Sequence, residues 1–505
     1  MRLRELCKDM RYRLMQGNDD VEVSDIIYDS RKVKPAAAFV CIAGAVTDGH
    51  KFIPDAVEKG VSVIVAERPE ETVAVPEDVT VIRVESARRA LAIMSAAYFG
   101  HPAEKLVTIG VTGTKGKTTT TYIIKDVLEH AGKKTGLIGT IAAIIGDETV
   151  PSCNTTPESY EIHKLMARMV EKGCQYMVME VSSQGLKLDR TAGINFDYGV
   201  FTNLSPDHIG PAEHADFDEY LRCKSMLFRQ CGIGIFNVDD KYAGRMMEGH
   251  TCSVVTFSAS GEKEADLKGH DVEFLNEGGR LGMSFSTSGS MDSRARINIP
   301  GMFSVYNALA TMAVCKSIGI ADDMILAGLD HVQVAGRVEP VPVSADFSMI
   351  IDYAHNEVST RSVLETLRQY GPSRLIALYG CGGNRSKLRR YDIGEVTGQL
   401  ADLSILTMDN PRFEQVKDIN DDIKVGLAKS GGKYVEIEDR KEAIAYAITH
   451  ARVGDMIVLL GKGHEDYVEI RGVKHHFSEK EAIWEIVGDI KADRYHMEDD
   501  GIRFF

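Results

Sequence analysis

A glycine-rich segment between an apolar run and an amphipathic run is the feature that most constrains how this chain folds. Residues 106–111 read LVTIGV, residues 113–119 read GTKGKTT, and an amphipathic run continues to residue 132. Small residues in such a turn let backbone N–H groups wrap a phosphate at the start of a helix. Lys117 adds positive charge, and the Thr118 hydroxyl can bind Mg²⁺. The segment therefore predicts a nucleoside-triphosphate site.

This loop is a variant of the common phosphate-loop pattern. The pattern G-x-x-x-x-G-K-[ST] requires a glycine where Val111 stands, five positions before Gly116. A tight strand-to-helix connection without a ligand is the alternative interpretation. The run of lysine and threonine favours ATP, with contacts expected from Gly113, Thr114, Lys115, Gly116, Lys117, Thr118 and Thr119.

Short apolar runs alternate with amphipathic segments along most of the chain, which predicts the α/β class with mostly parallel sheets. At about 150 residues per domain, 505 residues indicate three domains. We place them at residues 1–101, 102–330 and 331–505. They are expected to be a small α/β domain, a phosphate-loop domain and a Rossmann-like domain. The closing residues 495–505 are expected to form a peripheral tail.

Charge and cysteine usage exclude several classes of protein. The net charge of −15 disfavours nucleic-acid binding, because an acidic surface repels the phosphate backbone. The nine cysteines form no C-x-x-C pair, which predicts reduced thiols and a cytoplasmic location. No stretch of about 18 uninterrupted apolar residues occurs, so a membrane span is not expected.

A carboxylate follows the second apolar run of the predicted central domain. Glu180 ends the run at residues 176–180, and ligands gather at the carboxyl ends of parallel strands. We assign Glu180 to Mg²⁺ beside the phosphate loop. A carboxylate that caps a turn or faces solvent is the alternative.

Further motifs occur in a fixed order along nearly the whole chain. They are DSRKVKPAAAFVCIAG, TDGHKFIPDA, NTTP, MEVSSQGL, FTNLSPDHIG, VYNALA, VAGRVE, DYAH, YGCGGNRSK, DNPR and GKGHE. With the TGTKGKTT loop, this order resembles the Mur ligases, ATP-dependent enzymes that build the peptide stem of peptidoglycan precursors.

The resemblance implies one reaction and one set of substrates. The expected reaction joins meso-2,6-diaminopimelate to the D-Glu γ-carboxylate of UDP-N-acetylmuramoyl-L-alanyl-D-glutamate, through an acyl phosphate made with ATP and Mg²⁺. The three domains would bind the UDP group, ATP and the amino acid respectively. A monomeric enzyme with no nucleic-acid or membrane partner is expected.

The resemblance also implies five catalytic or metal-site residues, of which Lys117 and Thr118 belong to the loop. Lys117 is assigned to phosphate, and Thr118, Glu180 and His208 are assigned to Mg²⁺. Lys224 would be carbamylated by CO₂ and would then orient a second Mg²⁺. Composition alone would make Lys224 a solvated helix lysine and His208 a hydrogen-bonding loop residue.

Substrate contacts follow from matching positions. The UDP-linked substrate is assigned to Ser30, Thr47, Asn154, Thr155, Thr156, Ser182 and Arg190. The remaining ATP contacts are assigned to Asn307, Arg337, Asp352 and His355. Structural turns and helix caps are the alternative for the DSR, DGH and TTP segments, and a strand-end turn is the alternative for Asp352. Gln184 stands where the family often has histidine, and it receives no role.

The amino-acid site is assigned to the third domain. Arg412 can pair bidentately with the extra carboxylate that distinguishes diaminopimelate from lysine, and Glu465 suits the distal ammonium. L-lysine or another diamino acid is the alternative substrate, and a plain β-turn is the alternative for DNPR. The full set is Arg390, Asp409, Asn410, Pro411, Arg412, Gly461 and Glu465.

Other classes of function remain open from the sequence. A phosphate-loop kinase or ATPase would explain GKTT but would leave DNPR, GKGHE and the first domain without a role. A non-catalytic relative is disfavoured because Lys117, Glu180 and His208 are all retained. The N-terminal DSRKV segment argues against a folate polyglutamylating or cyanophycin-type ligase.

Overall fold

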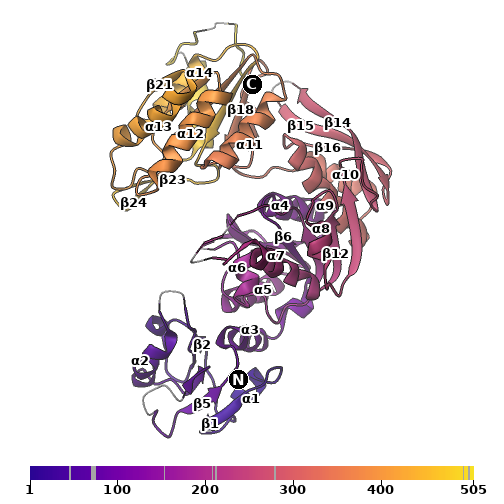
Figure 1. Cartoon of the computed structure of the whole chain (residues 1–505), viewed down its shortest axis with the longest axis vertical. Helices are drawn as coiled ribbons and strands as arrows, with labels where there is room; N and C mark the ends of the chain where they lie inside the picture. Colours follow the sequence, from indigo (N-terminus) through magenta and orange to yellow (C-terminus); the bar gives the residue numbers. More distant parts are fainter. Residues whose placement is uncertain are drawn as a thin grey trace. The chain divides into compact units, whose positions relative to one another are not determined.

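The computed structural model describes every residue except 45–46, 70–74, 153, 208, 211–212, 278–279, 493 and 499–500. The chain divides into two compact units, which are coloured along the sequence in Figure 1. Unit 1 contains Met1–Leu267 and Leu309–Ile325, and unit 2 contains Lys268–Ala308 and Leu326–Phe505. Each unit is described separately below.

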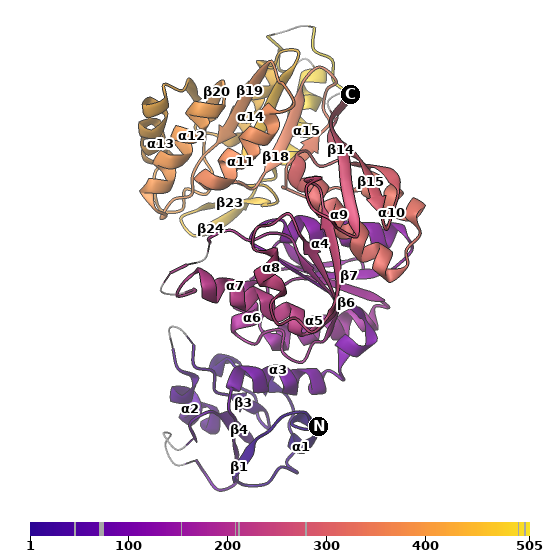
Figure 2. The ribbon, with the colours of Figure 1, turned by 45° about the vertical axis from the view of Figure 1, so that its right-hand side comes forward.

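Unit 1 begins with a five-stranded sheet whose strand order is β1-β5-β4-β3-β2. The pairs among β2, β3, β4 and β5 are parallel, and β1 pairs with β5 in the antiparallel sense. Helix α3 covers one face of this sheet (Figure 2), where its leucine and alanine side chains join the core. The elements are α1 (Leu3–Leu6), β1 (Arg13–Gln16), β2 (Ile26–Ile27), η1 (Ser30–Lys32), β3 (Ala38–Val40), η2 (Gly49–Phe52), α2 (Ile53–Glu58), β4 (Val63–Ala66), β5 (Thr80–Arg83) and α3 (Ala87–Tyr98).

An eleven-stranded sheet has the order β16-β15-β14-β13-β12-β11-β6-β10-β7-β8-β9, and its strands from β13 to β9 in this order belong to unit 1. These strands of unit 1 pair in parallel except for β7 with β8 and β8 with β9. The strands are β6 (Val107–Thr112), β7 (Thr135–Ile138), β8 (Ala142–Ile145), β9 (Glu148–Pro151), β10 (Tyr176–Glu180), β11 (Phe196–Phe201), β12 (Cys231–Asn237) and β13 (Ser253–Ser258). The helical segments are η4 (Pro102–Lys105), α4 (Lys117–His130), α5 (Ser159–Glu171), α6 (Ser183–Lys187), α7 (Phe217–Ser225), η5 (Met226–Arg229) and α8 (Ala243–Met247).

Strand β6 lies between β10 and β11 in this sheet. The glycine-rich loop follows β6, and Glu180 ends β10. Parallel strands carry their carboxyl ends to the same edge, so the loop and Glu180 meet there.

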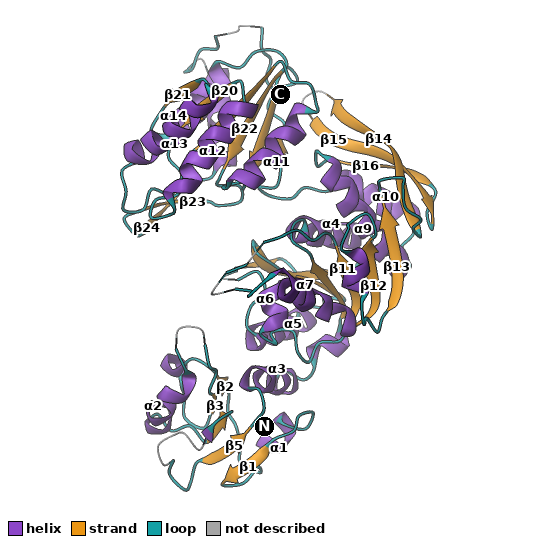
Figure 3. Cartoon of the chain, viewed as in Figure 1, coloured by secondary structure: helices purple, strands orange, loops and turns teal. Residues whose placement is uncertain are grey.

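Unit 2 contains a six-stranded sheet of order β17-β18-β22-β19-β20-β21, parallel except where β17 pairs with β18. Apolar cores fill both faces, and Figure 3 shows helices on both sides. The sheet and its helices are β17 (Glu339–Val341), β18 (Ser348–Asp352), α11 (Glu357–Arg368), β19 (Arg374–Tyr379), α12 (Lys387–Leu400), β20 (Leu403–Leu406), α13 (Val416–Ser430), β21 (Tyr434–Glu436), α14 (Arg440–Thr449), β22 (Asp455–Leu460) and α15 (Glu479–Lys491).

The remaining elements are short or lie where the units divide. Strands β23 (Tyr467–Ile470) and β24 (Val473–His476) form a hairpin, and β15 (Arg280–Gly289) pairs with β16 (Ser293–Ile297). The units divide within β14 (Leu267–Glu277), α9 (Met302–Ile318) and α10 (Asp322–His331). No helix among the described residues is long and apolar enough to cross a membrane.

The α/β class with mostly parallel sheets is confirmed, whereas the boundaries after residues 101 and 330 stay predictions. The expectation of a peripheral C-terminal tail is wrong. Ile502 is buried in the core of unit 2, and Phe504 packs on Phe347 with ring centres 6.1 Å apart. The amide of Phe505 also donates to the carbonyl of Val343 at 3.0 Å. Aromatic and aliphatic residues after the charged stretch are the signal that would have predicted this docking.

Helices α12 and α13 approach each other closely through two glycines. A methyl group on Gly426 would collide with the carbonyl oxygen of Tyr391, and one on Gly394 would collide with the carbonyl oxygen of Ile423. Backbone atoms cannot move aside as a flexible side chain can. The glycines therefore set the distance between these helices, and α12 in turn carries Arg389, which lines the cavity described below.

We predict that Gly426→Ala lowers the free energy of unfolding by about 2 kcal/mol, because the added methyl overpacks the helix pair. The matched control is Gly488→Ala in α15, where the added methyl would meet no described atom within 4 Å. That control should stabilise by about 0.5–1 kcal/mol through helix propensity alone. Thermal unfolding of the two variants tests the difference, and equal shifts would contradict it.

Candidate active site

The glycine-rich loop joins β6 to α4 with two glycines in conformations that other residues rarely adopt. Gly116 has φ +84° at the start of α4, and Gly113 has φ +152°. A side chain on Gly113 would collide with the Thr202 hydroxyl. The loop therefore needs glycine for the backbone angle at both positions and for space at Gly113.

A neighbouring segment after β11 holds this loop in place. The amide of Thr114 donates to the carbonyl of Asn203 at 2.9 Å, and the amide of Lys115 donates to the Asn203 side chain at 3.0 Å. The Asn203 amide group donates back to the carbonyl of Lys115 at 3.0 Å. Sequence analysis assigned no role to Asn203, and the TNLS motif after a predicted strand was the available signal.

Two lysine side chains converge on one backbone carbonyl of the loop. Lys117 Nζ and Lys224 Nζ donate to the Gly113 carbonyl at 2.8 and 2.7 Å. Lys224 is 1% exposed, and its ammonium lies 4.7 Å from the centre of the Tyr220 ring. Burial holds the pKa of Lys224 well below its usual range, and the positive charge of Lys117 lowers it further. Lys224 is thus a buried residue beside the loop, which composition alone would not predict.

The Glu180 carboxylate lies against the first turn of α4. It is 1% exposed and accepts hydrogen bonds from the Thr118 hydroxyl at 2.9 Å and from the Thr140 amide at 2.7 Å. The Thr140 hydroxyl adds a third bond at 3.1 Å. The structure thus brings together Thr118 and Glu180, two of the residues predicted to hold Mg²⁺. His208 lies outside the described residues, and sequence analysis missed Thr140.

The residues predicted to contact the UDP-linked substrate near Glu180 form a connected group. Thr156 Oγ1 donates to the carbonyl of Glu180 at 2.8 Å and accepts the amide of Ser182 at 2.9 Å. Arg190 donates to the carbonyl of Thr156 at 2.9 Å and pairs with Glu158 at 2.8 Å.

Two further members of this set lie beside that group. The hydroxyl of Thr155 bonds that of Thr140 at 3.0 Å, and Asn154 is exposed. Helix α5 begins at Ser159, with Glu158 as the residue before it.

The two predicted residues of the N-terminal sheet lie in capped turns. Ser30 begins η1, whose cap Asp29 accepts the amide of Arg31. Thr47 is exposed and precedes Asp48, whose carboxylate accepts from His50 and pairs with Arg68. These turns have the structural role that the sequence left open, and contact with substrate stays a prediction.

Among the described residues, His214, Glu219 and Cys223 have metal-binding atoms within 4.8 Å of one another. The Glu219 carboxylate already accepts the amide of Ala215 at 2.8 Å and pairs with Lys187 at 3.1 Å. Glu219 lies in the first turn of α7, and these bonds join its carboxylate to the residue before the helix cap and to the end of α6.

Unit 2 contains a polar cavity of about 120 Å³ at the carboxyl ends of its central strands. Five of the seven residues predicted to bind the amino acid line it, and so does His355, which was predicted to contact ATP. The lining residues are Tyr353, His355, Gly380, Cys381, Gly382, Arg385, Arg389, Asp409, Asn410, Arg412, Gly461 and Glu465.

Arg390 is placed away from these lining residues. Its guanidinium is 1% exposed and pairs with Glu414 at 2.8 Å and Asp422 at 2.9 Å. Arg389 and Arg385 line the cavity instead. Successive residues on a helix point about 100° apart, so Arg389 and Arg390 cannot both face the cavity. Contact between Arg390 and the amino acid stays a prediction that the geometry does not favour.

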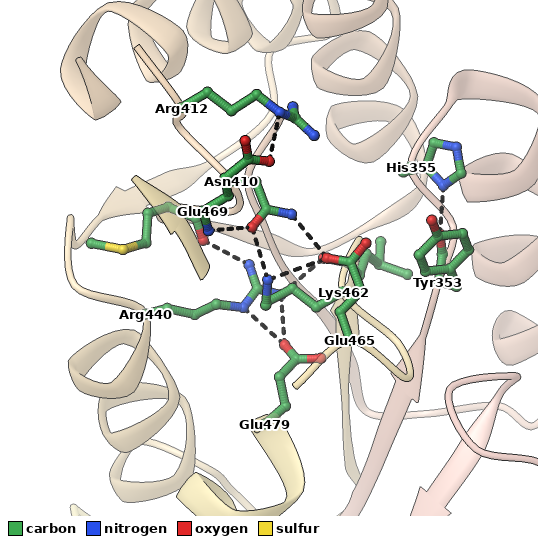
Figure 4. A network of polar contacts seen from close by, with 11 residues as sticks. Tyr353, His355, Asn410, Arg412, Arg440, Lys462, Glu465, Glu469 and Glu479 are labelled. Atoms are coloured by element: carbon green, nitrogen blue, oxygen red, sulfur yellow. Dashed lines mark hydrogen bonds and ion pairs between the residues drawn. The ribbon is translucent and has the colours of Figure 1, made fainter. Parts of the chain in front are cut away.

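A buried network joins two of the loops that line the cavity, those after β20 and β22 (Figure 4). The Asn410 amide group donates to Glu465 at 2.9 Å, and its oxygen accepts the amide of Glu469 at 2.9 Å. Lys462 is fully buried and lies 3.4 Å from Asn410 Oδ1 and 3.5 Å from Glu465 Oε2. Burial lowers the pKa of Lys462.

A buried ion pair lies behind this network. Arg440 and Glu479 are paired at 2.6 Å with almost no exposure. Arg440 also donates to the carbonyls of Met408 and Leu460, each at 2.9 Å. Burial raises the pKa of Glu479, and the facing Arg440 opposes that shift. Arg440, Lys462 and Glu479 were missed by sequence analysis because each is an ordinary surface residue by type.

Of the four predicted nucleotide residues in unit 2, Arg337 and Asp352 lie at a strained turn. Val338 has φ +44°, an outlier for a β-branched residue, and its amide donates to Asp352 Oδ2 at 2.7 Å. Burial raises the pKa of Asp352. Arg337 lies over the Tyr353 ring at 5.1 Å. The fourth residue, Asn307, is 4% exposed in α9.

Comparison with known families and proteins gives concordant matches along the chain. Residues 22–99 match "Mur ligase family, catalytic domain", residues 111–315 match "Mur ligase middle domain", and residues 336–463 match "Mur ligase, glutamate ligase domain". The UDP-N-acetylmuramoyl-L-alanyl-D-glutamate--2,6-diaminopimelate ligase of Clostridium tetani is 42% identical over 97% of this chain and 100% of that protein. The protein of the same name from Clostridium perfringens is 41% identical over 96% and 99%.

Solved structures agree with these matches. A structure of a UDP-N-acetylmuramoyl-L-alanyl-D-glutamate--2,6-diaminopimelate ligase superposes with a TM-score of 0.72 and 25% identity, covering 98% of this chain and 99% of the other. The MurF ligase of Thermotoga maritima in complex with ADP shares the fold, with a TM-score of 0.58 and 19% identity over 95% and 100% of the two chains.

Proposed function

The chain belongs to the Mur ligase family, and from that membership we propose that it joins meso-2,6-diaminopimelate to UDP-N-acetylmuramoyl-L-alanyl-D-glutamate. It is an ATP-dependent ligase that forms an amide bond. The observation that carries the choice of amino acid is the cavity of unit 2, where Arg412 and Glu465 supply a guanidinium and a carboxylate together. Diaminopimelate offers a carboxylate and an ammonium at its distal end, which match these two groups.

The reaction needs an activated acyl group, because a carboxylate does not react with an amine in water. A γ-carboxylate oxygen of D-Glu attacks the γ-phosphorus of ATP, which forms an acyl phosphate and releases ADP. The amine of the incoming amino acid then attacks the acyl carbon, expels inorganic phosphate and loses a proton. Both partners of the first step are anions, so cations and aligned N–H groups must stabilise the transition state.

Lys117 and the amides at the start of α4 supply that positive potential. Their loop is held by Asn203, so the donors are in place before substrate arrives. We assign the remaining nucleotide contacts to Asn307, Arg337, Asp352 and His355.

Thr118 and Glu180 suit Mg²⁺, because hydroxyl and carboxylate oxygens are the ligands that this ion prefers. When bound, Mg²⁺ would neutralise charge on the phosphate oxygens. Glu180 is held by Thr140, and Thr118 already touches the carboxylate. His208 is proposed as a further ligand, and a monomeric cytoplasmic enzyme is the expected form.

The residues Ser30, Thr47, Asn154, Thr155, Thr156, Ser182 and Arg190 are proposed to bind the UDP-linked dipeptide. Thr156 supports this assignment, because it connects Ser182, Arg190 and the strand that ends in Glu180. A substrate held by Arg190 would therefore lie beside Thr156, whose hydroxyl is hydrogen-bonded to the carbonyl of Glu180.

L-Lysine is the alternative to diaminopimelate as the amino acid that is added.

We predict that Lys117→Ala abolishes turnover without unfolding the protein, because the loop loses the charge that stabilises the transferred phosphoryl group. Phosphate release from ATP, UDP-linked dipeptide and diaminopimelate measures this. The matched control is Lys134→Ala, since Lys134 also donates to a backbone carbonyl but is exposed. Phosphate release by Lys117→Ala near the wild-type rate would contradict the assignment.

We also predict that Lys224 reacts with CO₂, because burial and Lys117 favour its neutral amine. Lys224→Ala should be nearly inactive, with partial recovery when short-chain carboxylates are added. A carbamate signal from ¹³C-labelled bicarbonate should be present in the wild type and lost in Lys224→Ala. Full activity of Lys224→Ala in CO₂-depleted buffer would remove this proposal.

The amino acid is tested by competition. With diaminopimelate and lysine at equal concentration, the wild type should favour diaminopimelate by on the order of one hundredfold in kcat/KM, since lysine offers no second carboxylate to the N–H donors of the partly buried Arg412 guanidinium. Arg412→Ala should reduce this preference at least tenfold. Mass spectrometry of the product measures the ratio, and predominant lysine incorporation by the wild type would overturn the choice of amino acid.

A further inference from the structure

The hairpin β23–β24 is attached by its backbone to the segment that carries Arg412. The amide of Arg412 donates to the carbonyl of Glu469 at 3.0 Å, and the amide of Arg471 donates to the carbonyl of Arg412 at 2.7 Å. The amide of Glu469 donates to Asn410 Oδ1 at 2.9 Å. Glu469 thus contacts both Asn410 and Arg412, two residues that line the cavity.

The side chains of the same two residues are also paired. Arg412 Nε donates to Glu469 Oε2 at 3.0 Å, as Figure 4 shows, and Nη1 donates to the carbonyl of Gly383 at 2.9 Å. A methyl group on Gly382 would lie 2.9 Å from Arg412 Nη1. The guanidinium therefore rests against the glycines of the CGGN motif and is fixed by Glu469 along its Nε edge.

Backbone conformation points to the same contact. Arg412 and Arg471 have φ of +53° and +50°, angles that residues other than glycine rarely adopt. Such conformations persist only where surrounding bonds hold them, and they concentrate at functional sites. Here the two residues are joined by the 2.7 Å hydrogen bond and flank the pairing with Glu469.

We propose that Glu469 is a positioning residue that sets the selectivity for the diamino acid by orienting the Arg412 guanidinium. This rests on the proposed function, in which Arg412 pairs with the distal carboxylate of diaminopimelate. A guanidinium has five N–H donors, and Glu469 and Gly383 together accept from two of them. The other N–H donors can bind the distal carboxylate of diaminopimelate. The hydrogen bond at Nε prevents a rotation of the guanidinium that would disrupt a bidentate pair.

An ordinary surface ion pair would not act in this way, because its side chains are free to move. The Glu469 and Arg412 side chains are 24% and 22% exposed, and their backbones are bonded to each other. The ion pair Glu357–Arg361 on α11 has nearly the same length, 2.8 Å, and 34% and 38% exposure. Among the described residues, this pair forms no side-chain hydrogen bond or ion pair with a residue that lines the cavity, so it provides a matched control.

The test compares Glu469→Ala, Glu469→Gln and Glu357→Ala in the full-length enzyme. Glu469→Ala should raise KM for diaminopimelate at least tenfold while kcat changes less than threefold. Its preference for diaminopimelate over lysine should fall at least tenfold, and KM for ATP and the UDP-linked dipeptide should stay within twofold. Glu469→Gln keeps an oxygen acceptor for Nε and should recover most of the selectivity. Glu357→Ala should behave as wild type.

A double-mutant cycle separates positioning from general structural damage. In the Arg412→Ala background, Glu469→Ala should change KM for diaminopimelate less than twofold further. Equal effects in both backgrounds, or a rise in KM for all three substrates, would overturn the role of Glu469 while wild-type use of diaminopimelate keeps the proposed function. A wild type that rejects diaminopimelate would overturn both.

Discussion

The Gly113 carbonyl oxygen is the point on which the chemistry of unit 1 depends, because two lysine ammonium groups bond to it. That arrangement requires a backbone with no side chain at Gly113, since Thr202 fills the space. It also requires Lys224 to be buried, which lowers its pKa and makes a neutral amine accessible. One glycine thus links the shape of the phosphate loop to the reactivity of a lysine more than one hundred positions later.

Much of this site could be predicted from sequence, for identifiable physical reasons. The loop is contiguous, and Glu180 ends an apolar run, so the rule that ligands gather at carboxyl ends of strands brings them together. Asn203 and Thr140 act through long-range hydrogen bonds to the loop and to Glu180, and residue type alone does not reveal such bonds. The burial of Lys224 likewise depends on how α7 packs, and only the family resemblance indicated its role.

Unit 2 shows the same division between what sequence predicts and what packing decides. Asp409, Asn410, Arg412, Gly461 and Glu465 follow strand ends, and they do line one cavity. Arg390 does not line the cavity, because it follows Arg389 on α12 and its side chain points in a different direction. The rotation of α12 about its axis is set by the glycine contacts between α12 and α13. The C-terminal residues were expected to form a tail, although the aromatic and aliphatic residues that follow the charged stretch could have indicated their docking on unit 2.

The buried charges behind the cavity explain how the protein can select one amino acid over another. Arg440 bonds the carbonyls of Met408 and Leu460, so one buried guanidinium fixes the starting points of two of the loops that line the cavity, those after β20 and β22. A buried pair of this kind adds little net stability but is costly to break, which suits a role in positioning. Three arginines and two carboxylates then line the same small space. A ligand lacking one carboxylate leaves N–H donors of Arg412 without an acceptor although Glu469 balances its charge, so rejection of the wrong amino acid arises from hydrogen bonds that are not formed.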